Sequence, residues 1–197
     1  TTNDYETIYT LAELKKWISK LAASDLFSFD LETTSLNPLE AQIVGISFSV
    51  ELGAAAYVPL NHTYKGAPEQ IKLSEALEAI TPLLEDSEKL KVGHNLKYDY
   101  SVLKNYGVSL SGIAFDTMLE SYVFDSTVNR HDMGSVAKRL LNLETISYED
   151  VTGDGASKIR FEEVPIDVAS NYAGEDAEVT LKIHEYLYPK IKKIGRL

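Results

Sequence analysis

The sequence predicts an α/β fold in which helices flank a mixed central β-sheet, and two observations support that prediction. Three short runs rich in Phe, Ile, Val and Tyr follow one another at residues 26–31, 42–50 and 54–60, with turn candidates between them. Further along the chain, helical periodicity alternates with two more strand candidates. Strands first, and then strands interleaved with helices, are typical of a sheet that carries helices on its faces.

The first predicted element is a helix over residues 10–24. Thr10 and Glu13 have capping-box spacing at its start, and apolar residues then recur at helical intervals. The period then changes to that of strands. The three runs named above predict strands in meander order, each beside the one before it.

The second half of the chain alternates between helix and strand. Asn95 and Gly107 are cap and stop signals for a helix over 96–107, and Asp116 is expected to cap the helix that begins at Thr117. The other expected elements are helices near 73–85, 117–125, 132–141 and 166–188, strands at 89–93 and near 113–115, and an irregular polar segment around GDGASK.

Length and composition limit the classes of protein to consider. A chain of 197 residues can bury one sizeable core, so residues 1–197 are expected to form a single domain, with a monomer as the default. There is no run of roughly 18 to 20 apolar residues, no signal-peptide pattern and no Cys, which favours a cytoplasmic protein without a membrane partner. The missing initial Met and the basic ending YPKIKKIGRL favour a fragment of a longer chain.

The net charge of −11 argues against binding nucleic acid through broad neutralisation of phosphates, because that mode needs a basic surface. Any nucleic-acid function must therefore be local. Carboxylates that hold divalent cations reverse the sign of the field around them, so an acidic protein can still contain a cationic site.

Acidic residues occupy positions where a core residue is expected. Residues i and i+2 of a strand share a face, so Asp30 and Glu32 lie side by side. Asp99 falls on the apolar stripe of its helix. In the last helix, Tyr172 and Asp176 are one turn apart on the stripe that faces the core.

Each buried, unpaired carboxylate lowers the stability of the fold by roughly several kcal/mol. Four of them close together also repel one another. A pair of hard divalent cations such as Mg²⁺ or Mn²⁺, about 3.5 to 4 Å apart, would stabilise such a cluster and is used for phosphodiester cleavage. The four His residues are scattered and Cys is absent, which disfavours a zinc site of the usual kind.

Each feature alone also fits an ordinary structural explanation. An Asp-x-Glu pair at a strand end is often solvated, and Asp99 fits a first-turn acid favoured by the helix dipole. Tyr172 and Asp176 fit a surface pair, and His94 and His131 fit hydrogen-bonding roles better than ligand roles. The joint occurrence of the acidic positions favours a functional site.

Three stretches, FDLETTSL, VGHNLKYD and YAGED, resemble in order and separation the three exonuclease motifs of the proofreading domain of bacterial DNA polymerase I, the family A polymerases. The resemblance includes GAAAYVPLNH, GIAFDTMLESY and RHDM, so it spans almost the whole chain. It implies a ribonuclease-H-like exonuclease fold, 3′-5′ hydrolysis of DNA ends, a bacterial cytoplasmic location, and a polymerase domain in the same parent chain as partner.

The resemblance also implies catalytic roles. Asp30, Glu32 and Asp176 would hold the metal ion that activates the attacking water, and Asp30 with Asp99 would hold a second ion at the leaving oxygen. Tyr172 would orient the water. The implied ions are two Mg²⁺, with Mn²⁺ or Zn²⁺ as substitutes in vitro.

The implied substrate is the 3′ end of single-stranded or frayed DNA, such as a primer terminus. The implied DNA contacts are Leu36 as a wedge between the last bases, Asn95 and Tyr98 at the terminal nucleotide, Met118 and Tyr148 along the cleft, and Arg130 at a phosphate. Stacking and backbone contacts tolerate any sequence, which suits the removal of any wrong nucleotide. Two positions depart from the family, with His94 where Gln is common and Tyr148 where Phe is common.

Three other functions compete with this interpretation. A ribonuclease D-like 3′-5′ exoribonuclease would use the same chemistry on RNA, although GAAAYVPLNH and RHDM favour the polymerase type. A catalytically weak scaffold domain beside a polymerase would be expected to lose a carboxylate, and none is lost. A non-enzymatic interaction domain would need the acidic positions to be solvated.

Overall fold

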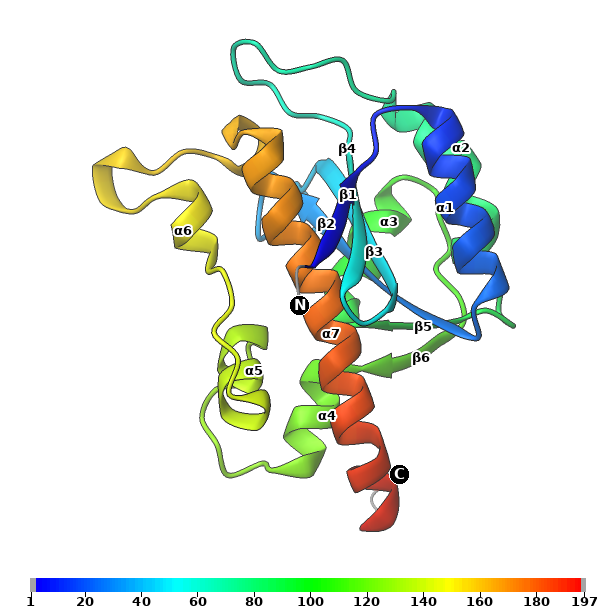
Figure 1. Cartoon of the computed structure of the whole chain (residues 1–197), viewed down its shortest axis with the longest axis vertical. Helices are drawn as coiled ribbons and strands as arrows, with labels where there is room; N and C mark the ends of the chain where they lie inside the picture. The colour runs from blue at the N-terminus through cyan, green and yellow to red at the C-terminus, as the bar shows by residue number, and fades with distance from the viewer. Residues whose placement is uncertain (1–2, 196–197) are drawn as a thin grey trace.

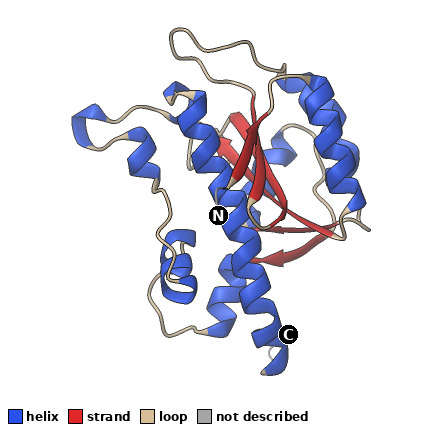
Figure 2. Ribbon diagram, viewed as in Figure 1, coloured by secondary structure: helices blue, strands red, loops and turns tan. Residues whose placement is uncertain are grey.

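The computed structural model describes residues 3–195 and contains a six-stranded sheet with helices on both faces (Figures 1 and 2). The strand order across the sheet is β1-β4-β3-β2-β5-β6. The strands are β1 (Asp4–Thr7), β2 (Leu26–Thr33), β3 (Ile43–Glu51), β4 (Ala54–Pro59), β5 (Leu90–Gly93) and β6 (Ile113–Asp116). The α/β architecture predicted from the sequence is therefore confirmed.

The sheet is mixed, as the order of the elements predicted. β2, β3 and β4 form an antiparallel meander, whereas β5 pairs parallel to β2 and β6 parallel to β5. β1 was not predicted, because DYET has no strand-like apolar pattern. It pairs parallel to β4, and the Tyr5 hydroxyl donates a hydrogen bond to the buried Glu178 carboxylate over 2.5 Å, so long-range contacts hold this strand in place.

The helices agree with the predicted ranges, with two differences. The α helices are α1 (Leu11–Ala23), α2 (Leu73–Glu85), α3 (Leu96–Asn105), α4 (Thr117–Phe124), α5 (Met133–Leu141), α6 (Tyr148–Thr152) and α7 (Ile166–Lys193), and the 3₁₀ turns are η1 (Gly155–Ser157) and η2 (Phe161–Glu163). The capping box of Thr10 and Glu13 is confirmed. α6 was not predicted, and α7 continues five residues beyond the expected end at 188, through Pro189.

The described residues form three hydrophobic clusters, one on the α1–α3 face of the sheet and two along α7, and β2 contributes side chains to both faces. Phe27, Phe29 and Leu31 pack with the apolar residues of α1, α2 and α3 on one face. On the other face, the Ser28 hydroxyl donates to the backbone carbonyl of Ala177 in α7 over 2.6 Å. In Figure 1, α7 runs across this second face, with α1 and α2 on the opposite side. Side chains that alternate along β2 therefore point alternately into the first core and toward α7.

Within residues 3–195, none of the helices is both long enough and apolar enough to span a bilayer.

Candidate active site

The site is built on β2, a central strand held on both sides by its neighbours. Asp30 pairs in register with Ser47 of β3, and Glu32 pairs with Gly45. A Cβ atom added at Gly45 would lie 2.2 Å from the hydroxyl of Tyr57, so glycine leaves room for this fully buried ring. The strand that carries the two carboxylates is thus fixed by hydrogen bonds and by close packing.

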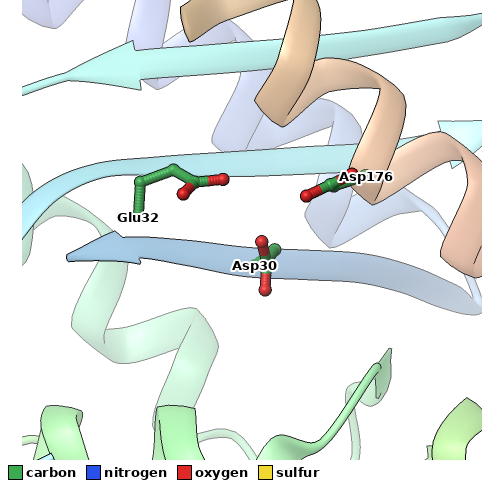
Figure 3. Close-up of side chains that lie close together, drawn as sticks. All are labelled: Asp30, Glu32 and Asp176. Atoms are coloured by element: carbon green, nitrogen blue, oxygen red, sulfur yellow. The ribbon is translucent and has the colours of Figure 1, made fainter. Parts of the chain in front are cut away.

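α7 brings a third carboxylate to the same place. Figure 3 shows Asp30 and Glu32 on β2 and Asp176 reaching toward them from α7. Each of the three offers a carboxylate oxygen, and these oxygens all lie within 4.8 Å of one another. Residues separated by almost 150 positions in the sequence therefore meet in one cluster.

The fourth carboxylate comes from the first turn of α3. Asp99 is 2% exposed, and the backbone N–H of Leu31 donates to its Oδ1 over 3.3 Å. Its position on the buried stripe of the helix, predicted from the sequence, is confirmed. The hydrogen bond from Leu31 places Asp99 beside the part of β2 that lies between Asp30 and Glu32.

The charges of these residues are poorly compensated within the described chain. Glu32 Oε1 and Asp176 Oδ1 are buried and have no hydrogen-bond partner among residues 3–195. Burial raises the pKa of Asp30 to about 7. Burial, followed by repulsion from Asp30, raises the pKa values of Glu32, Asp99 and Asp176 well above the usual range. The uncompensated negative charge of this cluster favours the binding of protons or cations.

The donor set fits hard divalent cations. Carboxylate oxygens are the ligands preferred by Mg²⁺ and Mn²⁺, and an ion would satisfy the two orphaned oxygens directly. Asp30, Glu32 and Asp176 can act as one ligand group by their mutual distances, and Asp99 lies next to Asp30 outside that group. The arrangement is chemically suited to holding cations against a phosphate.

A cavity of about 310 Å³ opens beside the carboxylates. Leu36 lies at its rim and is 96% exposed. The Tyr98 hydroxyl is 2.5 Å from the Thr33 hydroxyl and also donates to the carbonyl of Ser35. The lining residues are Asp30, Leu31, Glu32, Thr33, Thr34, Ser35, Leu36, Tyr98, Tyr148, Lys158 and Tyr172.

Tyr172 lies between the carboxylates and the aromatic rings of Phe161 and Tyr148. Its ring packs 5.9 Å from that of Phe161 and 6.4 Å from that of Tyr148. Burial, and then the negative charge of Asp176, raise the pKa of its phenol far above the ordinary value. Tyr172 therefore keeps its proton, and its hydroxyl interacts with the Asp176 carboxylate at the edge of the cavity.

Three sequence-predicted DNA contacts lie outside this cavity. Asn95, Met118 and Arg130 are absent from its lining, and Arg130 pairs with Asp132 over 3.0 Å at the surface. Asn95 is the N-cap residue of α3, as predicted, but its backbone is left-handed, with φ of 62°, and its side chain makes no capping hydrogen bond. Asp116 instead accepts from the N–H groups of Asn95 and Leu96 while capping α4 as predicted.

The histidines of the motif regions make hydrogen bonds, as the sequence indicated. His94 Nδ1 is 2.8 Å from the Thr117 hydroxyl, and His131 Nδ1 is 2.8 Å from the Ser121 hydroxyl. Neither residue belongs to the carboxylate group.

Sequence reasoning missed Lys158 as a lining residue. It belongs to the segment expected to be irregular and polar, which contains η1. A lysine in such a segment gives no signal of its own, because exposed lysines are common in loops.

Comparisons of the sequence with known proteins are consistent with the geometry. A protein-family model described as 3′-5′ exonuclease matches residues 5–192. DNA polymerase I of Pseudomonas aeruginosa is 48% identical over 196 residues, which is 98% of this chain and 22% of that protein. The chain thus spans about a fifth of the length of the curated relatives that it matches.

Solved structures share the fold at low sequence identity. A structure of Trypanosoma brucei RNase D in complex with RNA U12 matches with a TM-score of 0.73 at 19% identity, over 94% of this chain and 62% of that one. A structure of the POL domain of Pol1 from M. smegmatis matches with a TM-score of 0.72 at 17% identity, over 97% of this chain and 28% of that one. Brucella melitensis NrnC with bound Mg²⁺ matches with 0.66 at 19%, over 97% and 81%. These matches support the ribonuclease-H-like exonuclease fold.

Proposed function

The chain belongs to the 3′-5′ exonuclease family found in bacterial DNA polymerase I, and from that membership we propose that it removes nucleotides from the 3′ end of single-stranded or frayed DNA. Water attacks the terminal phosphodiester in line, which releases a 5′-nucleotide and leaves a new 3′-hydroxyl. In the cell this activity proofreads for a DNA polymerase. The partner is the polymerase domain of the same longer bacterial protein, and the chain itself is a single monomeric domain.

The observation that carries the proposal is the group of four carboxylates from three elements. Two of their oxygens are buried without a partner among the described residues, and burial, followed by repulsion from Asp30, raises the pKa values of the other three carboxyl groups. An interior arranged only for stability would not keep such a cluster, because unpaired buried carboxylates are costly. Binding of cations and phosphate chemistry account for it.

Asp30, Glu32 and Asp176 would hold one divalent ion, and Asp30 with Asp99 a second. Mg²⁺ is the ordinary ion, with Mn²⁺ or Zn²⁺ as substitutes. When bound, such ions neutralise the carboxylates, lower the pKa of water and stabilise the charge that develops on the phosphoryl oxygens.

The surrounding side chains would position the substrate. Tyr172, which keeps its phenolic proton, donates a hydrogen bond that orients the attacking water. Leu36, Tyr98 and Tyr148 enclose the terminal nucleotide by stacking and apolar contact, which is independent of base identity. Asn95, Met118 and Arg130 would act outside the cavity, on nucleotides farther from the end.

The test is degradation of a 5′-labelled single-stranded oligonucleotide in Mg²⁺ or Mn²⁺. We expect a ladder that shortens from the 3′ end and disappears in EDTA and in Asp176→Asn. Glu69→Gln, which changes an exposed carboxylate that belongs neither to the cavity lining nor to the carboxylate group, should behave as wild type. An RNA oligonucleotide of the same sequence separates this function from that of an exoribonuclease. Absence of a ladder, with Mg²⁺ binding demonstrated by calorimetry, would refute the catalytic proposal and leave a scaffold domain.

A further inference from the structure

The cavity beside the carboxylates has one cationic side chain among the described residues that line it, which is Lys158. We propose that Lys158 binds a phosphate of the single-stranded 3′ end as the strand enters the cavity. This inference rests on the proposed function and adds a substrate contact that the motifs do not indicate.

The segment that carries Lys158 is folded back on itself by backbone contacts. Gly153 adopts a left-handed φ of 75°, and a Cβ atom added there would lie 3.2 Å from the carbonyl oxygen of Ser157. The Ile159 N–H donates to the carbonyl of Thr152 over 2.8 Å. The residue after Lys158 is thus tied to the last residue of α6, which fixes the base of the lysine side chain beside that helix.

An aromatic stack directs the side chain toward the cavity. Lys158 Nζ lies 5.6 Å from the centroid of the Tyr148 ring. Tyr148 stacks on Phe161 with 6.2 Å between centroids and 16° between planes, and Phe161 is 1% exposed. The ammonium group therefore rests on a ring whose own position is set by the core, which limits where the lysine can reach.

The charge of Lys158 is available for a ligand. Arg160, two residues along the chain, pairs with Glu162 over 3.0 Å and with Glu163 over 3.8 Å. Lys158, in contrast, forms no ion pair within residues 3–195, and its ammonium group lies over the ring of Tyr148. Arg130, to which the family resemblance gives a phosphate contact, pairs with Asp132 and lies outside the cavity lining.

Charge balance gives a reason for a cation at this point. Two divalent ions would cancel four ionised carboxylates, so the loaded site has no surplus positive charge for the phosphates that follow the reacting one. Each further nucleotide brings one negative charge near Asp30 and Glu32. A lysine at the mouth of the cavity compensates one of these charges, and its flexible stem suits a contact that must be remade after each cleavage.

The test measures binding by fluorescence anisotropy of a 5′-fluorescein oligothymidylate in Ca²⁺, with the oligonucleotide checked for intactness on a gel. Wild type is compared with Lys158→Gln, Lys158→Arg and Lys15→Gln, where Lys15 is an exposed lysine of α1 distant from the cavity. We expect Lys158→Gln to raise the Kd about fivefold, as for a solvent-exposed ionic contact, and Lys158→Arg and Lys15→Gln to stay near wild type. The slope of log Kd against log salt should fall by about 0.7 in Lys158→Gln alone.

Steady-state cleavage separates this inference from the proposed function. In an active enzyme, Lys158→Gln should raise KM and leave kcat within about twofold, since the lysine acts on binding. If wild type fails to cleave but its binding still depends on Lys158, the catalytic proposal fails and the phosphate contact stands. A wild-type protein that does not bind the oligonucleotide, or a Lys158→Gln variant that binds as tightly as wild type, would overturn the inference.

Discussion

The substitution Asp30→Asn is expected to stabilise the metal-free protein above neutral pH and to remove its stabilisation by metal ions. Burial is the largest cause of the raised pKa values of Glu32, Asp99 and Asp176, and the charge of Asp30 is the next cause for all three. Asparagine has nearly the same shape and no charge, so the change relieves repulsion without leaving a cavity. The same change removes a ligand shared by both expected ion positions.

The magnitude follows from the pKa of Asp30, which burial raises from 3.8 to about 7. A carboxyl group with a raised pKa keeps its proton in the folded state while the unfolded chain has lost it. The folded state then binds more protons, so the free energy of unfolding decreases as pH rises from about 4 to about 7. The full difference between these two pKa values corresponds to a loss of about 4 kcal/mol in the free energy of unfolding. Because Asp30 is partly open to the cavity and the carboxylates titrate together, we expect about 2 kcal/mol.

Urea unfolding followed by tryptophan fluorescence measures this effect, since Trp17 is the single tryptophan and is buried. In EDTA, wild type should lose about two thirds of this total, on the order of 1 kcal/mol, between pH 5 and pH 8, because the loss runs from about pH 4 to about pH 7, and Asp30→Asn should lose distinctly less. Millimolar Mg²⁺ at pH 8 should restore the stability of wild type and leave Asp30→Asn unchanged. Glu69→Gln, which removes an exposed carboxylate, serves as the matched control.

Two results would refute this reasoning. One is a wild-type stability in EDTA that is constant or increases between pH 5 and pH 8. The other is an Asp30→Asn profile parallel to that of wild type, which would mean that the repulsion within the cluster is relieved by another route.

Three further outcomes are expected. Tyr172→Phe should lower kcat about tenfold and leave calorimetric Mg²⁺ binding unchanged, since it removes a hydrogen bond to the water; an unchanged kcat would contradict that role. Gly45→Ala should destabilise the protein by about 3 kcal/mol in urea unfolding, because its Cβ would meet the buried Tyr57 hydroxyl at 2.2 Å. Asp116→Ala should cost about 2 kcal/mol, because its carboxylate accepts from N–H groups at the starts of both α3 and α4, and a loss below about 0.5 kcal/mol would show that water replaces it.

The parts of the fold that the sequence predicts are those in which one local pattern determines the structure. The alternation along β2 separates Phe27 and Phe29 from Asp30 and Glu32, and the structure has these sets on opposite faces. Asp99 on a helical stripe is likewise buried. In each case, the side-chain period of the element fixes the face on which the residue lies.

Other features depend on contacts between distant segments and leave no local pattern. β1 exists because β4 offers it an edge and Glu178 accepts the hydrogen bond from Tyr5. The role of Asp116 at two helix starts follows from the approach of α3 to α4, which the spacing of residues does not encode. Lys158 reaches the cavity only because its loop folds back on α6.

The acidity of the chain is compatible with the proposed DNA substrate because repulsion from the surface and attraction inside the cavity act over different distances. A net charge of −11 repels a polyanion over the surface, and salt screens that repulsion beyond a Debye length of about 8 Å. Inside the cavity, the proposed ions would cancel the carboxylates, and Lys158 would add a positive charge. Attraction is then confined to the few nucleotides that enter the cavity. Under the proposed function this arrangement selects a free strand end, because a paired duplex would bring many more phosphates against the acidic surface.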